Sequence, residues 1–435
     1  MSNERTISRF ARPEYATRAA RRDRSDAQAK AEAADWSDMN DRTPTKRWLR
    51  PPRLRTIEMD SGERHASWLE LFFDLVLVVA IAQLAHLFAD HPDWHSALIT
   101  GGLFAAVFLA WQGFMAYADR FDSDDLPFRI ATFVQMLALL ALAVQIGDVA
   151  DGHYARFAIA FAILRAILVA QYIRAYVHAP AARPLIRRYG GVYAISVVLW
   201  FVSAALPAQW ALVLWAVAIV LDLSMPPLST RLHRAIPTDP AHLPERFGLF
   251  TLIVLGELVV TVGIGTMEAT WSPGVVIVAV AGFGIAACLW WVYFERLAGH
   301  ELPRAAVPVV TFAYAHIPLL GGLMFVAGGV SVLVRADESA TPAGAWALCA
   351  GAAAFLAALN VAHAQLVAGP PREVLRARWV ALVAILAIPL FARTPIAVAA
   401  AAFALLAALV TFEALTCGPE QAAVDGDAAR VDARQ

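Results

Sequence analysis

Five ionisable residues interrupt apolar stretches of this 435-residue sequence, namely Glu70, Asp74, Arg165, Glu257 and His316. If those stretches cross a bilayer, a charge at the centre costs at least about 2.5–3.5 kcal/mol on insertion scales, so each charge needs a partner, water or a functional reason. Carboxylate, guanidinium and imidazole groups at such depth could bind an ion or a small solute and move protons. We therefore take these five residues as candidates for an ion or solute pathway.

The spacing of these residues suggests two groups. Glu70 and Asp74 are four residues apart, so they share one face of a helix, although its N-terminal dipole could also steady both. Glu257 should lie near mid-membrane, and Arg165 lies at comparable depth and is expected to be its counter-charge. His316 is also central, two residues before Pro318. The alternative to a pathway is a structural polar clasp between helices, in which each bond is worth about 0.6–2 kcal/mol.

The remaining polar residues of the apolar stretches have a simpler interpretation. We expect them to form hydrogen bonds between helices or to lie at helix ends, and the main ones are Gln83, Asn360, Tyr293 and Glu295. Tyr293 follows Trp290 and Trp291, which is typical of an interfacial aromatic belt. No cluster with metal-ligand spacing, phosphate-binding glycine loop or serine elbow is visible, so we expect no metal, no cofactor and no catalytic residue. Four glycines should permit close helix packing: Gly282, Gly284, Gly321 and Gly322.

The elements that must position these residues are membrane-spanning helices. The sequence is 59% hydrophobic and 16% charged, against about 45–50% and about 25% in soluble domains. The formal net charge of −1 argues against a nucleic-acid partner. We expect an all-α polytopic membrane protein, because the apolar runs are too long for barrel strands. Twelve spans are predicted, at 68–89, 97–118, 129–149, 154–176, 190–206, 208–224, 247–266, 274–296, 305–333, 344–367, 377–392 and 394–416.

The arginines predict the orientation and the domain organisation. Loops expected inside the cell carry nearly all the loop arginines, Arg246 among them, so both termini should be cytoplasmic. No signal peptide is visible, because the first 66 residues are polar and lack an apolar run. We expect a disordered basic leader facing anionic headgroups, two six-helix halves joined by a cytoplasmic linker, and a disordered tail. In order, these parts are residues 1–66, 67–225, 226–246, 247–416 and 417–435.

The two halves show traces of a parallel internal repeat. Tyr117-Ala-Asp-Arg120 near the end of the second span matches Tyr293-Phe-Glu-Arg296 near the end of the eighth, at an offset of 176 residues. Leu126-Pro127 matches Leu302-Pro303 at the same offset. Each match alone is weak, but their shared order favours duplication. Two similar halves would be related by an axis along the membrane normal, with a pathway between them.

Several of these stretches resemble the bacterial low-temperature-requirement protein A family. The resemblance covers residues 60–415, and the leader before Arg64 lies outside it. It implies an integral membrane protein without an established biochemical activity, and Glu295 stands where the family is expected to have Asp. The family's marked positions correspond to Glu70, Asp74, Arg246, Glu257 and His316. The motifs that carry the resemblance are 64–76, 80–85, 245–257, 290–294 and 314–319.

Three kinds of activity remain open from the sequence. The preferred interpretation is a secondary transporter of a small solute or ion, with proton coupling, in the bacterial inner membrane. A cation channel is the alternative, since Phe72-Phe73-Asp74 loosely resembles the signature of a potassium-channel family. A lipid-modifying intramembrane enzyme is a weaker option, because the pair His86 and Asp90 lacks the usual spacing. We expect a non-enzymatic protein whose partners are the lipid bilayer and an unidentified solute or ion, and a homodimer is left open.

Overall fold

The computed structural model describes residues 49, 51–54, 67–122, 125–235, 242–297, 300–303, 305–336, 342–367 and 369–416. The chain divides into two compact units, residues 1–51 with 124–127, and residues 52–123 with 128–435. Of the first unit, the structure describes residues 49, 51 and 125–127. The second unit contains the helices discussed below, apart from the first two residues of α5. The predicted tail, residues 417–435, lies outside the described residues.

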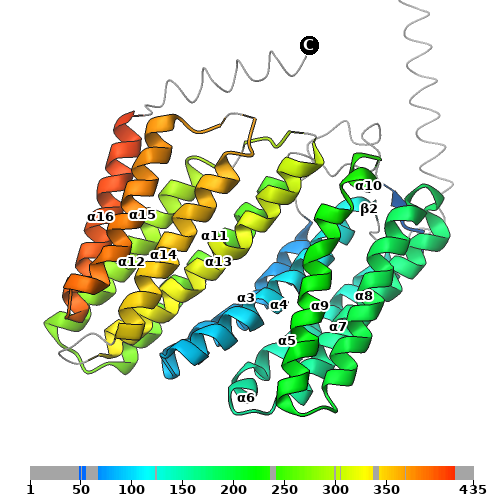
Figure 1. The fold of residues 1–435 in the computed structure, drawn as a ribbon, viewed down its shortest axis with the longest axis horizontal. Helices are drawn as coiled ribbons and strands as arrows, with labels where there is room; N and C mark the ends of the chain where they lie inside the picture. The colour runs from blue at the N-terminus through cyan, green and yellow to red at the C-terminus, as the bar shows by residue number, and fades with distance from the viewer. Residues whose placement is uncertain are drawn as a thin grey trace, which may run out of the picture. The chain divides into compact units, whose positions relative to one another are not determined.

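The all-α membrane fold predicted from the sequence is confirmed, because twelve helices among the described residues are long and apolar enough to cross a bilayer. Every predicted span coincides with one of them (Figure 1). The spanning helices are α3 (Trp68–Asp90), α4 (Trp94–Arg120), α5 (Leu126–Val144), α7 (Ala155–His178), α8 (Arg183–Ser203), α9 (Ala208–Leu228), α11 (His242–Glu268), α12 (Pro273–Phe294), α13 (Ala306–Arg335), α14 (Pro342–His363), α15 (Arg372–Phe391) and α16 (Pro395–Thr416). Short helical segments are α6 (Ile146–Ala150), α10 (Thr230–Ala235) and the 3-10 turn η2 (Pro180–Ala182).

Helix boundaries differ from the prediction where charged residues begin a helix. Helix α8 begins at Arg183 rather than 190, because a proline in its first turn starts a helix well even among arginines. The predicted linker, residues 226–246, is largely helical. Within it α9 continues to Leu228, α10 follows, and α11 starts at His242.

Local capping fixes where several spans begin. Ser67 and Glu70 form a reciprocal capping box at the start of α3, with the Ser67 hydroxyl accepting from the Glu70 amide at 3.3 Å. Asp93 caps α4, and Ser272 caps α12 directly before Pro273. These caps satisfy backbone N–H groups that a helix end otherwise leaves unpaired. The capping box also fixes Glu70 at the entrance of α3.

Part of the predicted disordered leader is structured. Strand β1 (Arg53–Leu54) pairs antiparallel with β2 (Phe121–Asp122), the segment that follows α4. Pro52 is buried beside it, and Leu54 packs against the hydrophobic core. The prediction of an unstructured arm is therefore wrong for these residues, and the rest of the leader up to 66 lies outside the described residues except Leu49 and Pro51.

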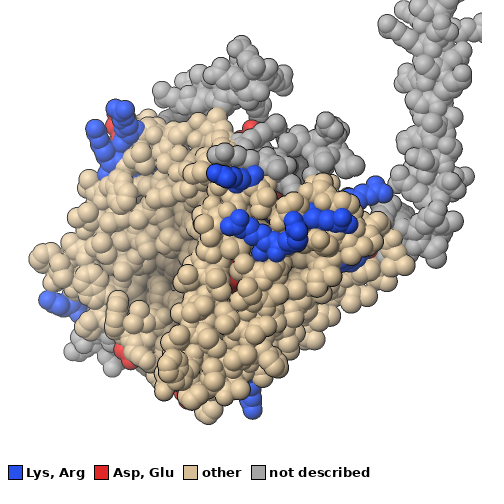
Figure 2. Space-filling model, turned by 45° about the vertical axis from the view of Figure 1, so that its right-hand side comes forward, with Lys and Arg blue, Asp and Glu red and all other residues tan. Residues whose placement is uncertain are grey.

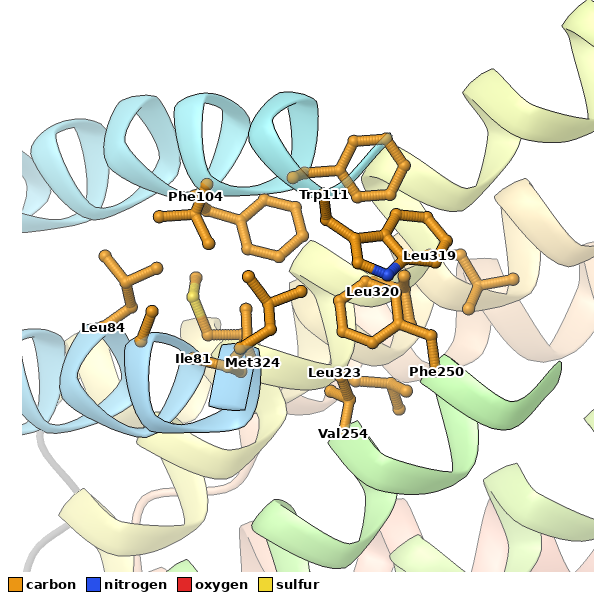
Figure 3. Packing of buried hydrophobic residues seen from close by; sticks show 14 of the residues in the cluster. Ile81, Leu84, Phe104, Trp111, Phe250, Val254, Leu319, Leu320, Leu323 and Met324 are labelled. Carbon is orange, nitrogen blue, oxygen red and sulfur yellow. The ribbon is translucent and has the colours of Figure 1, made fainter. Parts of the chain in front are cut away.

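The core is formed where α13 lies against α3, α11 and α14. Figure 3 shows side chains of α3, α4, α11 and α13 interdigitating, among them Ile81, Phe104, Val254 and Leu323. The close approach of α13 and α14 depends on glycines, because a Cβ at Gly322 would lie 2.5 Å from the Gly351 carbonyl oxygen. A Cβ added at any of the other three predicted glycines would also meet a neighbouring side chain at close range. Gly282 faces Val330, Gly284 faces Phe403 and Gly321 faces Phe104, which confirms the packing role predicted for all four.

The outer surface of the helices is largely apolar, as contact with lipid requires. Large side chains such as Leu137, Phe201, Val280 and Phe283 are exposed along the helix flanks. Figure 2 shows a largely uncharged flank, with most of the basic side chains toward the upper end and a few single ones at the lower end. A soluble protein rarely exposes so large an apolar surface. The fold is that of an integral membrane protein.

Candidate functional site

The junction between α3 and α11 contains a buried ion-pair network. Arg246 donates from Nη2 to Asp74 Oδ1 at 3.0 Å and from Nη1 to Glu70 Oε2 at 3.2 Å. The indole N–H of Trp111 donates to the same Asp74 oxygen at 2.7 Å. Asp74 and Trp111 are fully buried, and Arg246 is 1% exposed. One guanidinium therefore binds both acidic residues of α3, and α4 adds a third contact.

Sequence position explains this geometry. Arg246 is four residues into α11, and Asp74 is six residues into α3, so the two lie at similar distances from their helix starts, about 6–9 Å at 1.5 Å per residue. The Phe247 ring packs against Trp111, with ring centroids 5.1 Å apart, and holds the indole toward Asp74. Among the hydrogen bonds of the described residues, Asp74 Oδ2 and Arg246 Nε have no partner. The network is thus strong but incompletely satisfied.

A second buried ion pair lies inside the first half of the chain. Arg165 of α7 donates from Nη2 to Asp222 Oδ2 of α9 at 2.7 Å, and the Ser196 hydroxyl of α8 donates to the same oxygen at 3.4 Å. The guanidinium carbon lies 4.8 Å from the ring centroid of Tyr193, a cation–π arrangement. The expected pairing of Arg165 with Glu257 is therefore wrong, because Asp222 neutralises Arg165 instead.

Gly113 of α4 makes room for the Arg165 side chain. A Cβ at this position would lie 2.6 Å from Arg165 Nη1, 2.9 Å from a Leu168 methyl carbon and 3.6 Å from the Tyr193 hydroxyl. An added Cβ would force the guanidinium or the Leu168 side chain to shift. The absence of a side chain at residue 113 is thus part of how the pair is positioned.

The pair lines a pocket of about 70 Å³, enough for several water molecules. The walls include Asp119 and Arg120 from the end of α4, Tyr189 and Tyr193 from α8, and Tyr314 from α13. Further wall residues come from the end of α9, from α10 and from the first turns of α11 and α13. The pocket therefore extends from one end of the bundle, where these helices meet, to Arg165. Arg165 lies ten residues after Ala155 and thirteen before His178, the two ends of α7.

His233 of α10 forms part of the same pocket outside the spanning helices. Its Nε2 lies 2.8 Å from the Tyr189 hydroxyl, and Arg120 lies over the Tyr189 ring at 5.9 Å. Burial, assisted by the positive charge of Arg120, lowers the pKa of His233 to about 3. His233 is neutral near pH 7, so it adds no charge to the pocket.

The other predicted pathway residues lie outside this pocket. Glu257 is partly exposed on α11, where the Thr261 hydroxyl donates to its Oε1 at 3.2 Å. His316 is fully buried and bonded on both nitrogens, with Nδ1 2.8 Å from the Phe312 carbonyl and Nε2 3.0 Å from the Tyr293 hydroxyl. This arrangement matches the structural alternative for His316, a clasp between α12 and α13.

The four residues predicted to be structural differ in their environments. Tyr293 is 1% exposed and bonded to His316, so its placement in an interfacial aromatic belt is wrong. Asn360 is buried, but its amide atoms have no hydrogen-bond partner among the described residues. Gln83 and Glu295 are exposed. A polar clasp therefore forms at Tyr293, whereas the Asn360 amide makes no interhelical bond within the described part of the chain.

The second half has its own buried clamp. Arg378 of α15 binds Glu413 of α16 through two parallel hydrogen bonds of 2.8 Å, and its Nη1 lies 3.2 Å from His363 Nδ1 of α14. Arg296 adds a bond from Nη2 to the Glu413 carbonyl oxygen at 2.9 Å. Each carboxylate oxygen of Glu413 has a donor, so this cluster joins α14, α15 and α16 structurally.

Two residues that complete these networks do not stand out in the sequence pattern. Arg246 is grouped by that pattern with the cytoplasmic loop arginines, although it lies within the motif that carries the family resemblance. Asp222 has no predicted role, although it is an acidic residue inside an otherwise apolar span. A search for every charge within a predicted span would find Asp222, which lies in 208–224. Arg246 lies one residue before the predicted span 247–266, so the search would have to include the flanking residues.

Comparisons with known proteins agree with the membrane fold. The family model described as bacterial low temperature requirement A protein matches residues 65–416. A protein of Rhizobium meliloti (strain 1021), described as uncharacterized, is 26% identical over 297 residues. That alignment covers 65% of this chain and 71% of the relative. The family match extends from the residues just before α3 to the end of α16.

Proposed function

The chain belongs to the bacterial low temperature requirement A family, and we propose that it is a secondary transporter of a small solute rather than an enzyme. The Arg165–Asp222 pocket is the observation that carries this proposal. It is a cavity with both charged and apolar walls that enters a membrane-spanning bundle from one end and reaches an ion pair deep between the helices. Carriers bind their solutes at such depth, between groups of helices that rock around the site.

The atoms left without partners support binding rather than a purely structural role. Arg165 Nε and Nη1, Arg120 Nε and Asp222 Oδ1 are buried and have no hydrogen-bond partner in the described part of the chain. Nearly all buried polar atoms of native proteins are satisfied, so exceptions call for an explanation. A solute that enters the pocket would supply the missing partners.

The Glu70–Asp74–Arg246 network is the proposed link between the two halves. It joins the first helix of each half, and protonation of Asp74 would remove its attraction to Arg246 and loosen α3 from α11. This gives proton coupling a physical basis. Because Arg246 pairs with both carboxylates of α3, its positive charge opposes the binding of a cation there, and the network favours a carrier over a cation channel.

The internal repeat remains part of this proposal. Glu70 and Arg246 are 176 residues apart, the same offset as between Tyr117 and Tyr293 in the matching loop motifs. An ion pair between equivalent residues is expected where two related helices meet at a pseudo-two-fold axis. The packing is not equivalent throughout, since α13 packs against α11 and α14, whereas α5 meets α4 through the Phe128 ring.

We further propose the bacterial inner membrane as the location, with the pocket open to the cytoplasm. Exposed arginines at the starts of α8 and α15, such as Arg187, Arg188 and Arg376, mark the cytoplasmic end by the positive-inside rule. The pocket lies at this same end. Both termini are then cytoplasmic, and a homodimer stays a prediction.

A thiol placed in the pocket wall tests the proposal without knowledge of the solute. Ala313 lines the pocket, so Ala313→Cys is made in a chain whose native cysteines (Cys288, Cys349, Cys417) are replaced by alanine. A membrane-impermeant maleimide is added to either face of sealed vesicles. We expect labelling from the cytoplasmic face and, more slowly, from the opposite face, because a carrier exposes its site to both sides in turn.

The matched control is Ala402→Cys, since Ala402 is fully buried on α16 away from the pocket. Its thiol should react from neither face. Labelling of Ala313→Cys from one face alone, in vesicles of proven orientation, would show a dead-end cavity and contradict the proposed carrier.

A further inference from the structure

Four polar atoms of residues that line the pocket have no hydrogen-bond partner among the described residues, and they include both donors and an acceptor. Within the described part of the chain, the donors are Nε and Nη1 of Arg165 and Nε of Arg120, and the acceptor is Oδ1 of Asp222. Arg165 is fully buried and Asp222 is 5% exposed. A solute that satisfies this set must therefore offer acceptor atoms to a guanidinium and a donor group to a carboxylate.

The charge of the lining restricts the solute further. Among the described lining residues, Arg120 and Arg165 are matched in number by Asp119 and Asp222, and His233 is neutral because burial lowers its pKa to about 3. A lining in which the described charges cancel gives little electrostatic advantage to a solute that carries only one charge. It favours a solute whose own charges also cancel.

The size and the walls of the pocket agree with a small amphoteric molecule. A volume of about 70 Å³ holds few non-hydrogen atoms. The rings of Tyr189, Tyr193 and Tyr314 line it, and aromatic faces attract ammonium groups. The Arg165 fork, in turn, matches the geometry of a carboxylate.

We propose that the Arg165–Asp222 pocket binds a small zwitterion of the amino-acid type, with its carboxylate on Arg165 and its ammonium group on Asp222 and the tyrosine rings. This inference rests on the proposed carrier function and adds its substrate class. The Arg165–Asp222 pair is complementary to such a solute, because the negative carboxylate of the solute faces the positive Arg165 and its positive ammonium group faces the negative Asp222. Gly113 leaves the space that the guanidinium occupies in this arrangement.

The test compares glycine with probes that each carry one part of it. The purified protein is kept in detergent at constant ionic strength, and its thermal unfolding is followed with glycine, acetate, methylammonium or acetamide. A ligand that binds only the folded state raises the unfolding temperature with the logarithm of its concentration once that concentration exceeds the Kd. We expect glycine to produce a given shift at a concentration at least about tenfold below that of any single-group probe, which is about 1.4 kcal/mol in binding free energy.

A pocket-filling variant separates binding from general stabilisation, because small osmolytes stabilise any folded protein by exclusion from its surface. Ala313→Leu adds bulk to the pocket wall and keeps both charged residues of the pair in the sequence, and it should abolish the logarithmic glycine effect. Ala401→Leu changes an exposed alanine of α16 and should retain that effect.

The outcomes separate the substrate class from the carrier function. An equal effect of acetate would indicate an anion site, and an equal effect of methylammonium a cation site. A glycine effect that is the same in wild type and Ala313→Leu would show that glycine does not bind in the pocket. Each of these results overturns the zwitterion assignment. The carrier proposal itself stands or falls on labelling of Ala313→Cys from both faces, which does not involve glycine.

Discussion

At the scale of single residues, Arg165 and Asp222 depend on each other. Both are buried, and each is the counter-charge of the other at 2.7 Å. Loss of one partner leaves an uncompensated charge inside the bundle, which is far more costly than loss of the pair as a whole. The ion pair is therefore a site where stability and the proposed binding meet.

Asp222→Asn should destabilise the protein by about 3–5 kcal/mol, the cost of breaking a buried pair from one side. The double variant Arg165→Gln with Asp222→Asn should be more stable than Asp222→Asn alone, because no charge is left unpaired. Unfolding in detergent by denaturant titration measures both. Additive losses in the double variant would show that the two side chains are not coupled.

His233 should make stability depend on acidity. Its folded pKa of about 3 lies below its ordinary value of 6.5, so below pH 6.5 the unfolded chain takes up a proton that the folded protein does not. The free energy of unfolding then falls as pH falls from 6.5 toward 4, by at most about 1.4 kcal/mol per pH unit. Above pH 6.5 both states are neutral and His233 contributes nothing to the slope.

Comparison with His233→Gln isolates this effect from other titrating groups. The variant keeps a neutral polar side chain and should lose the part of the slope that His233 causes. His178→Gln alters an exposed histidine and should behave as the wild type does. Identical pH profiles of wild type and His233→Gln would contradict the assignment of a neutral buried imidazole.

Individual residues can be predicted from the sequence only in part. Burial cost selects Asp74 and Arg165 as unusual, because a charge in an apolar run is visible in one dimension. It does not say which helices meet, so depth alone pairs Glu257 with Arg165. Arg165 instead meets Asp222, and Arg246 meets Glu70 and Asp74, because helix neighbours are set by packing that the sequence pattern does not reveal.

At the scale of elements, close helix packing depends on glycine backbones that face each other. In α13 and α14, the Gly322 and Gly351 backbones approach so closely that neither position has room for a methyl group. Without a hydrophobic driving force between helices in lipid, such close van der Waals contact is a main source of association.

Gly322→Ala should therefore destabilise the protein by about 1–3 kcal/mol, the usual cost of overpacking. The matched control is Gly263→Ala on α11, where an added Cβ would meet nothing within 4 Å. Thermal unfolding in detergent compares the two variants. A loss at Gly263 as large as that at Gly322 would show that helix flexibility, and not the contact with α14, explains the result.

The helices themselves are readily predicted, because twenty apolar residues in a row have few alternatives in a membrane. All twelve spans are found from hydropathy, including the short ones at α8 and α15. The strand β1 escapes prediction, since two residues amid prolines and arginines carry no periodic signal. The start of α8 escapes it too, because hydropathy excludes the arginines of its first two turns.

At the scale of the whole molecule, the proposed transport cycle moves the two six-helix halves, residues 67–225 and 247–416, relative to each other. The pocket and the α3–α11 network both involve helices of the two halves. The Glu70–Asp74–Arg246 contacts join the two halves near the N-terminal ends of α3 and α11. Arg246→Gln would remove both ion pairs at once, so it should change the relative populations of the two conformations of the transport cycle. If the network is only a static polar clasp, the same variant should lower the stability of the protein and leave those populations unchanged.

The most direct test of this account is the distance between the halves at both membrane faces, measured by pulsed electron spin resonance in lipid nanodiscs. One spin-label pair replaces Arg188 and Arg376 at one end, and the other replaces Asp151 and Arg393 at the opposite end; all four residues are exposed. The account predicts two distance populations for each pair, with the separation at one end widening as the other narrows, and a changed proportion in Arg246→Gln. A single distance at each end, the same in wild type and Arg246→Gln, would contradict it.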